Sequence, residues 1–236
     1  MNSSQPNNPQ QTRLFRIIKL LTHLQPGYLV RSMKNPQVVV ILFAVISGGL
    51  ALGIITTIAF LTEFPLLFPP LGASAFILFY TPMSEQASPR HVILAHTVCL
   101  FLGLLSIHFL AIYFFDSNTL DLTVMSWLHV AAIALAMVLS TTVMISFKFE
   151  HPPAAATALI ASMGYILNST QIIGFVAAVI LLVLEAYLFN RILGGIPYPH
   201  WRYNQKIAQD YKELADLSSK KSRMGEQLTT SIFHKR

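Results

Sequence analysis

Two segments of this chain share an unusual pattern, a pair of prolines followed by small and hydroxyl side chains. They are FPPLGASAFI at Phe68–Ile77 and HPPAAATALI at His151–Ile160. Proline is well accepted in the first turn of a helix, so Pro70 and Pro153 predict the starts of two helices. The first turn of a helix has unpaired N–H groups and about half a positive charge. The pattern therefore indicates a site for a small anion.

The candidate binding residues are the prolines and the residues that follow them. Small side chains let a ligand reach the backbone, and the hydroxyls of Ser74 and Thr157 add hydrogen-bond donors. The alternative interpretation is structural, because small residues also let membrane helices pack closely. The complete candidate set is Pro69, Pro70, Gly72, Ala73, Ser74, His151, Pro152, Pro153, Ala154, Ala155, Ala156 and Thr157.

Two ionisable residues are candidates for proton coupling. His151 stands at the inner mouth of the second proline segment, and histidine titrates near physiological pH. The alternative role for His151 is a neutral ring that holds the loop by hydrogen bonds. Glu185 lies in a long apolar segment, where a carboxylate is costly and by default functional. We consider His108 or Arg191 as its partner, with a purely structural hydrogen bond as the alternative.

Neither a metal nor another cofactor is expected, because the eight histidines are scattered without metal-ligand spacing. His96 and His129 are interpreted as packing or interfacial residues. No nucleophile, base and orienting group occur together at a recognisable spacing, so we do not expect an enzyme. The net charge of +6 comes from basic residues that flank apolar segments. This distribution is typical of loops kept in the cytoplasm and does not indicate nucleic-acid binding.

The composition is that of an integral membrane protein. Apolar residues make up 54% of the chain and charged residues 11%, against about 25% charged residues in soluble domains. Long apolar runs predict four helices, and each exceeds the roughly 20 residues needed to cross a lipid bilayer. Their predicted ranges are 38–61, 92–115, 124–147 and 172–193.

The proline segments 62–80 and 148–167 lie between these helices, and each predicts an extended stretch followed by a half-helix that starts at mid-membrane. A helix of Pro70–Tyr80 would be about 16 Å long, roughly half a bilayer. IITTI at Ile54–Ile58 and LSTTV at Leu139–Val143 precede the two pairs in the same order. We therefore predict an all-α membrane protein with six crossings in two inverted three-segment repeats, each with a proline-broken middle segment, as in transporters.

The predicted organisation has four parts. Residues 1–37 form a polar head whose Arg13–Leu24 segment either lies on an anionic membrane surface or packs as a first bundle helix. Residues 38–115 and 116–195 form the two repeats. Residues 196–236 form a cytoplasmic tail, with a helix for packing or assembly at His200–Leu217. The basic residues place both termini in the cytoplasm. A homo-oligomer is possible, but nothing in the sequence specifies a number of subunits.

EHPPAAATALIASMG at Glu150–Gly164, together with FPPLGASAFILF at Phe68–Phe79, resembles the HPP family of integral membrane proteins. The resemblance extends over roughly residues 36–197. It implies a bacterial or chloroplast-envelope protein, in a family whose cyanobacterial and plastid members are linked to nitrite transport. The polar residues 1–12 lack the Arg- and Ser-rich length of a plastid transit peptide. We therefore expect a bacterial (cyanobacterial) plasma membrane rather than the chloroplast envelope.

Nitrite is a small monovalent anion, which agrees with the site inferred from the proline pairs. The leading hypothesis is a transporter of a small inorganic anion, nitrite first and nitrate second, that works by alternating access and is coupled to protons. One alternative is a passive anion channel that uses the same site. Another is a membrane-embedded sensor or assembly module that acts through the C-terminal tail.

Overall fold

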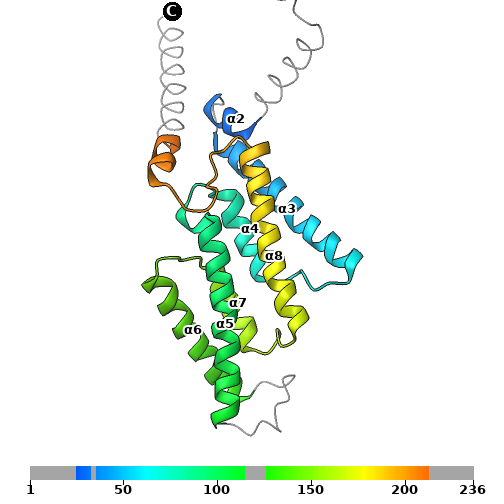
Figure 1. Cartoon of the computed structure of the whole chain (residues 1–236). Coiled ribbons are helices and arrows are strands. Elements are labelled where there is room, and N and C mark those ends of the chain that lie inside the picture. The colour runs from blue at the N-terminus through cyan, green and yellow to red at the C-terminus, as the bar shows by residue number, and fades with distance from the viewer. Residues whose placement is uncertain (1–24, 33–35, 115–125, 213–236) are drawn as a thin grey trace, which may run out of the picture.

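The computed structural model describes residues 25–32, 36–114 and 126–212, and every regular element in these ranges is a helix (Figure 1). The predicted helix at Arg13–Leu24 and the last part of the predicted tail helix lie outside the described residues, whereas residues 205–212 are helical. The other elements are α2 (Pro26–Ser32), α3 (Pro36–Thr62), α4 (Pro70–Tyr80), the 3₁₀ helix η1 (Glu85–Ala87), α5 (Pro89–Phe114), α6 (Trp127–Ser146), α7 (Pro153–Ser162), α8 (Ser169–Tyr187) and the π-helix η3 (Leu188–Leu193).

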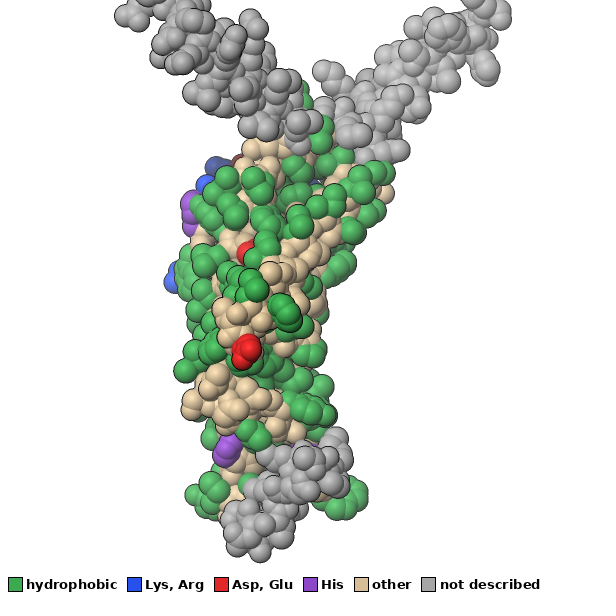
Figure 2. Space-filling view, turned by 90° about the vertical axis from the view of Figure 1, so that its right-hand side faces the viewer, with side chains coloured by type: hydrophobic (Ala, Val, Ile, Leu, Met, Phe, Trp, Pro, Cys, Tyr) green, Lys and Arg blue, Asp and Glu red, His purple; other side chains and the backbone are tan. Residues whose placement is uncertain are grey.

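Among the described residues, four helices are long and apolar enough to cross a membrane: α3, α5, α6 and α8 with its π-helical extension. They agree with the four predicted ranges to within three residues at each end. The face seen in Figure 2 is covered mainly by hydrophobic side chains, as a surface in contact with lipid tails requires. The predicted all-α membrane class is therefore confirmed.

The two short helices α4 and α7 begin at the second proline of each pair, as predicted. The first proline of each pair, Pro69 or Pro152, already has helical dihedral angles. Since proline fixes φ near this value and needs no N–H partner, the pair sets the direction of the helix at no hydrogen-bonding cost. In Figure 1 both helices begin near the middle of the molecule and continue towards opposite ends.

Each long helix that precedes a proline pair is followed by a residue with a left-handed backbone. Glu63 after α3 has φ 55° and Lys148 after α6 has φ 52°. At the end of α6, the amide of Lys148 donates to the carbonyl of Ile145 and the amide of Phe149 donates to the carbonyl of Met144. This is the Schellman pattern of helix termination. Both chain reversals are thus built locally before the prolines.

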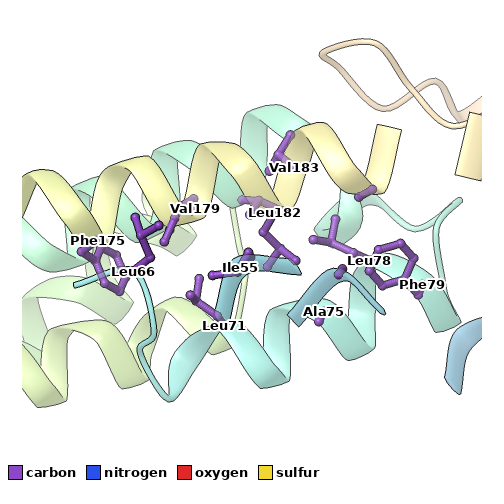
Figure 3. Packing of buried hydrophobic residues seen from close by; sticks show 14 of the residues in the cluster. Ile55, Leu66, Leu71, Ala75, Leu78, Phe79, Phe175, Val179, Leu182 and Val183 are labelled. Atoms are coloured by element: carbon purple, nitrogen blue, oxygen red, sulfur yellow. The ribbon is translucent and has the colours of Figure 1, made fainter. Parts of the chain in front are cut away.

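Helix packing joins the two halves of the chain. α5 packs against α6 and α7, whereas α8 packs against α3 and α4, and α4 also contacts α7. The apolar contact of α8 with α3 and α4 is drawn in Figure 3, where Leu182 and Val179 point towards Ile55 and Leu71. A Cβ added to Gly103 of α5 would lie 2.6 Å from the Ala158 carbonyl oxygen, so α5 and α7 approach each other closely at this glycine.

Candidate functional site

A buried polar cluster lies where the two short helices meet. The Ser74 hydroxyl of α4 is 2.8 Å from Nε2 of His96, and the Thr157 hydroxyl of α7 is 2.7 Å from Nδ1 of the same ring. These three side chains have no solvent-exposed surface. One imidazole of α5 therefore joins the first turns of both short helices.

Helix geometry explains why the two hydroxyls meet one ring. Ser74 is the fifth residue of α4 and Thr157 is the fifth residue of α7, so each stands one turn after its proline, on the same side as that proline. Pro70 and Pro153 are buried with them. α5 packs closely on α7 at Gly103, two turns beyond His96, and this close approach sets the ring beside Thr157.

His151 completes the cluster from the loop before α7. Its Nε2 is 2.9 Å from the Ser74 hydroxyl and its Nδ1 is 2.8 Å from the carbonyl oxygen of Gln86 in η1. Its ring meets that of His96 edge to face, with centroids 5.1 Å apart. The sequence placed His151 at the mouth of the segment, but the side chain is fully buried. The turn at Lys148 directs the following residues inward, which explains the difference.

The predicted unpaired N–H groups of the two helix starts are not present. Leu71 and Gly72 donate to the carbonyls of Phe68 and Pro69, and the matching pair in α7 donates to His151 and Pro152. The reason is the helical conformation of the first proline, which moves the start of each helix back to residues without an N–H. The donors available at this centre are therefore side chains, whereas the helix dipoles keep their direction.

The remaining predicted residues lie around the cluster. Pro69, Gly72, Ala73 and Pro152 are exposed, Ala155 and Ala156 are partly exposed, and Ala154 is buried. A Cβ added to Gly72 would meet nothing within 4 Å, so packing does not require glycine there. Of the twelve candidates, Ser74, Thr157 and His151 bring polar side-chain atoms to the centre.

Glu185 is buried in α8, and both of its carboxylate oxygens lack a hydrogen-bond partner among the described residues. Neither predicted pairing is formed. His108 is exposed and contacts the Leu104 carbonyl through Nδ1, and Arg191 donates to the Tyr198 carbonyl. Glu185 lies just before the π-helix η3, an irregularity that often marks functional positions.

His96 is the member of the cluster that the sequence-based candidate set did not include, because it was interpreted as a packing or interfacial histidine. Its position seven residues into a long apolar helix carried a usable signal, since ionisable residues within membrane segments are costly and usually functional. His129, by contrast, lies at the start of α6, where Nδ1 bonds to the Ser126 hydroxyl. That contact closes a helix end and supports the original interpretation of His129.

The first residues of the tail pack on the loop that carries Gln86. The Tyr198 hydroxyl donates to the Ala87 carbonyl, and the Arg90 amide donates to the Trp201 carbonyl. Burial raises the pKa of the Tyr198 phenol, which therefore remains a neutral donor. The tail and His151 thus hold adjacent carbonyls of one short loop.

The polar cluster can donate hydrogen bonds and pass protons. Hydroxyls both donate and accept, and an imidazole donates from one nitrogen while it accepts at the other. Among the described residues no group of three or more His, Cys, Asp or Glu side chains is arranged to hold a metal ion. The chemistry that these residues offer is therefore recognition of an acceptor and movement of a proton.

The comparisons with known proteins agree with the motifs. Residues 33–199 match the family model described as HPP, transmembrane region, and this range is more than half of the chain. No curated protein and no solved structure gave a match. The chain, with its two proline pairs and, in the described residues, four helices long and apolar enough to span a membrane, belongs to the HPP family of integral membrane proteins.

Proposed function

We propose that this protein carries a small inorganic anion across a membrane, with nitrite as the first candidate and nitrate as the second. The observation that carries the proposal is the shared contact of Ser74 and Thr157 with His96. Buried polar residues within a membrane domain are expensive and mark pathways for substrates or protons. Here they lie at the junction of two short helices whose positive ends face it.

The two breaks support alternating access between two inverted repeats. α3, α4 and α5 form one series and α6, α7 and α8 the other, each with a left-handed turn and a proline pair at the same place. The third helix of each series packs on the first two helices of the other. If α4 and α7 each complete one crossing with the stretch before them, the chain crosses six times. Rocking of one series against the other would then expose the cluster to each side in turn.

The anion would bind by replacing hydrogen bonds within the cluster. Thr157 would turn its hydroxyl proton from the His96 ring to the anion, Ser74 would turn its proton from the His151 ring, and a ring N–H would add a third donor. The backbone amides of Leu71 and Gly72 already have partners. Selectivity for a small anion would follow from the full burial of the four polar side chains of the cluster, Ser74, His96, His151 and Thr157.

Protons are the proposed coupling ion. His151 contacts the cluster directly, and Glu185 supplies a buried carboxyl without a hydrogen-bond partner among the described residues. A bacterial plasma membrane with both termini in the cytoplasm provides the expected inward proton gradient. The positive charges near the ends of the apolar segments support this orientation.

Nitrite uptake into vesicles that contain the purified full chain tests the proposal. Protein-dependent uptake that an imposed pH gradient drives beyond equilibrium supports the carrier. Protein-dependent flux that stops at equilibrium supports the passive channel instead. Absence of protein-dependent nitrite and nitrate flux, with folded protein shown by thermal unfolding, contradicts anion transport.

A role as a sensor or assembly module through the tail is the second candidate. It is favoured by the contacts of Tyr198 and Trp201 with the loop of Gln86 that holds His151. Deletion of residues 213–236 leaves these contacts in place. Full transport by this truncated chain supports the carrier. A truncated chain that folds normally but no longer acts in the cell supports the sensor or assembly module.

A further inference from the structure

The polar cluster is a continuous chain of hydrogen bonds with two ends. It runs from Thr157 to His96, from His96 to Ser74, from Ser74 to His151 and from His151 to the Gln86 carbonyl, at 2.7, 2.8, 2.9 and 2.8 Å. All four side chains are fully buried. This hydrogen-bond chain connects α7 to η1 through side chains of α5, of α4 and of the residue before α7.

The direction of every hydrogen bond in this chain follows from the group at its end, the Gln86 carbonyl. A carbonyl oxygen only accepts, so Nδ1 of His151 carries a proton. When His151 is neutral its Nε2 has no proton, and the Ser74 hydroxyl donates to it. Ser74 has one proton, so it accepts from Nε2–H of His96, whose bare Nδ1 then accepts from the Thr157 hydroxyl. The neutral chain donates in one direction, from Thr157 to Gln86.

We propose that His96 relays a proton between Thr157 and His151 through Ser74, and that it thereby couples the anion site at the start of α7 to the charge of His151. This inference rests on the proposed function for the identity of the ligand, an anion of a weak acid that arrives with its proton. The hydrogen-bond chain itself does not depend on that identity.

The relay conserves protons at each step. An incoming proton binds the Thr157 oxygen, and the original hydroxyl proton moves to Nδ1 of His96. The proton on Nε2 of His96 moves to the Ser74 oxygen, and the Ser74 proton moves to Nε2 of His151. The chain gains one proton in total, His151 becomes an imidazolium, and His96 remains neutral with its proton on the other nitrogen. The Thr157 hydroxyl is then free to donate to the anion.

The Pro70 carbonyl offers Ser74 a competing acceptor, 3.1 Å from its hydroxyl. That distance is longer than the 2.8 Å to His96, and in an α-helix the same carbonyl already accepts the amide of residue 74. The competing arrangement would leave His96 unchanged when His151 gains a proton. An experiment must therefore distinguish the relay from this arrangement, in which Ser74 donates to the Pro70 carbonyl.

The charged and titratable groups around His151 influence whether it can hold a positive charge. His96 and His91 approach it from α5, and a charge on either ring disfavours a charge on His151. His91 is buried, with Nε2 3.7 Å from the exposed carboxylate of Glu85 in η1. Glu150 directly precedes His151 in the chain. The Glu85 carboxylate is the solvent-exposed member of this group of side chains.

NMR of the full chain with ¹⁵N-labelled histidine, in lipid vesicles across a pH range, tests the relay. His96→Gln and His151→Gln assign the two rings among the eight histidines. At alkaline pH we expect a proton on Nε2 of His96 and on Nδ1 of His151. On acidification, doubly protonated His151 and transfer of the His96 proton to Nδ1 support the relay. Retention of the proton on Nε2 of His96 overturns it.

Thr157→Val keeps the shape of the side chain without the hydroxyl, and Thr157→Ser restores the donor. The valine variant should lose the pH-dependent change at His96, and the serine variant should keep it. Flux measured on the same vesicles separates the two proposals. Nitrite flux with an unchanging His96 overturns the relay but not the carrier, whereas a changing His96 without anion flux supports the relay and removes nitrite as the ligand.

Discussion

A pair of contacting rings lies beside each of the two proline pairs, and the two ring pairs differ in chemistry rather than in geometry. Phe68 precedes the first proline pair and meets Phe175 of α8 edge to face, with centroids 5.0 Å apart at 71°. His151 precedes the second pair and meets His96 of α5 at 5.1 Å and 62°. His96 also lies 5.7 Å from Phe175, so the two pairs are neighbours.

The comparison indicates a division of roles between the two junctions. The aromatic pair excludes water and stabilises the junction by packing, whereas the histidine pair brings hydrogen-bonding atoms to the same depth. Both halves contribute one hydroxyl, from Ser74 and Thr157. Each junction thus has a ring pair and a neighbouring hydroxyl, whereas the ionisable groups of the cluster lie at one junction.

His151→Phe should have the largest effect on transport, because it makes the second junction resemble the first. A phenyl ring fits a site built for an imidazole but removes the contacts with Ser74 and the Gln86 carbonyl. We expect proton-driven nitrite uptake to fall on the order of 100-fold or more, as for loss of a proton-transfer group. The protein should remain folded by thermal unfolding. Near-normal uptake would show that the polar junction is dispensable.

Thr157→Val and Ser74→Ala should each lower uptake by about tenfold, which corresponds to loss of one hydrogen bond to a charged ligand. Both hydroxyls contact His96 from opposite sides, so the two effects should be similar. Initial uptake rates over a nitrite concentration series measure them. Thr157→Ser is the matched control and should retain most activity. A large effect at only one of the two positions would contradict the equivalence of the two hydroxyls.

Gly103→Ala should lower both stability and uptake, whereas Gly72→Ala should be neutral. A Cβ at Gly103 would lie 2.6 Å from the Ala158 carbonyl oxygen and push α7 away from α5, but at Gly72 it meets nothing within 4 Å. Overpacking of this kind costs about 1–3 kcal/mol. Thermal unfolding in detergent and uptake in vesicles measure the two variants side by side. Loss of uptake in Gly72→Ala would indicate that the anion contacts that exposed backbone.

Phe68→Ala should have the smallest effect on transport and act mainly on stability. The ring is partly buried against Phe175, so we expect a loss of about 2 kcal/mol, below the usual range for a fully buried phenylalanine. A lower unfolding temperature with uptake within about twofold of normal would fit apolar packing. Complete loss of uptake in a folded variant would mean that the aromatic junction takes part in transport directly.

The sequence was sufficient to predict the membrane class, the four long helices and the start of each short helix. Apolar runs without charges have few alternatives in a lipid bilayer, and a proline pair can begin a helix but not continue one. The Ser74 and Thr157 hydroxyls also lie at the helix starts where the pattern placed them.

The hydrogen bonds that connect the residues of the site could be identified only from the tertiary structure. His96 is 22 positions from Ser74 and 61 from Thr157, and no local pattern predicts that its ring contacts both hydroxyls. The state of the backbone amides was also missed, because it depends on whether Pro69 and Pro152 are themselves helical. Both errors concern long-range packing or a single pair of dihedral angles, which residue spacing does not determine.

The most direct test of the account is the external pH when nitrite is added to weakly buffered vesicles that contain the full chain. Joint movement of anion and proton through the cluster predicts alkalinisation in proportion to nitrite uptake, above that of protein-free vesicles. The same signal should be absent with His96→Gln. Protein-dependent nitrite uptake without proton movement, or proton movement unchanged in His96→Gln, would contradict the account.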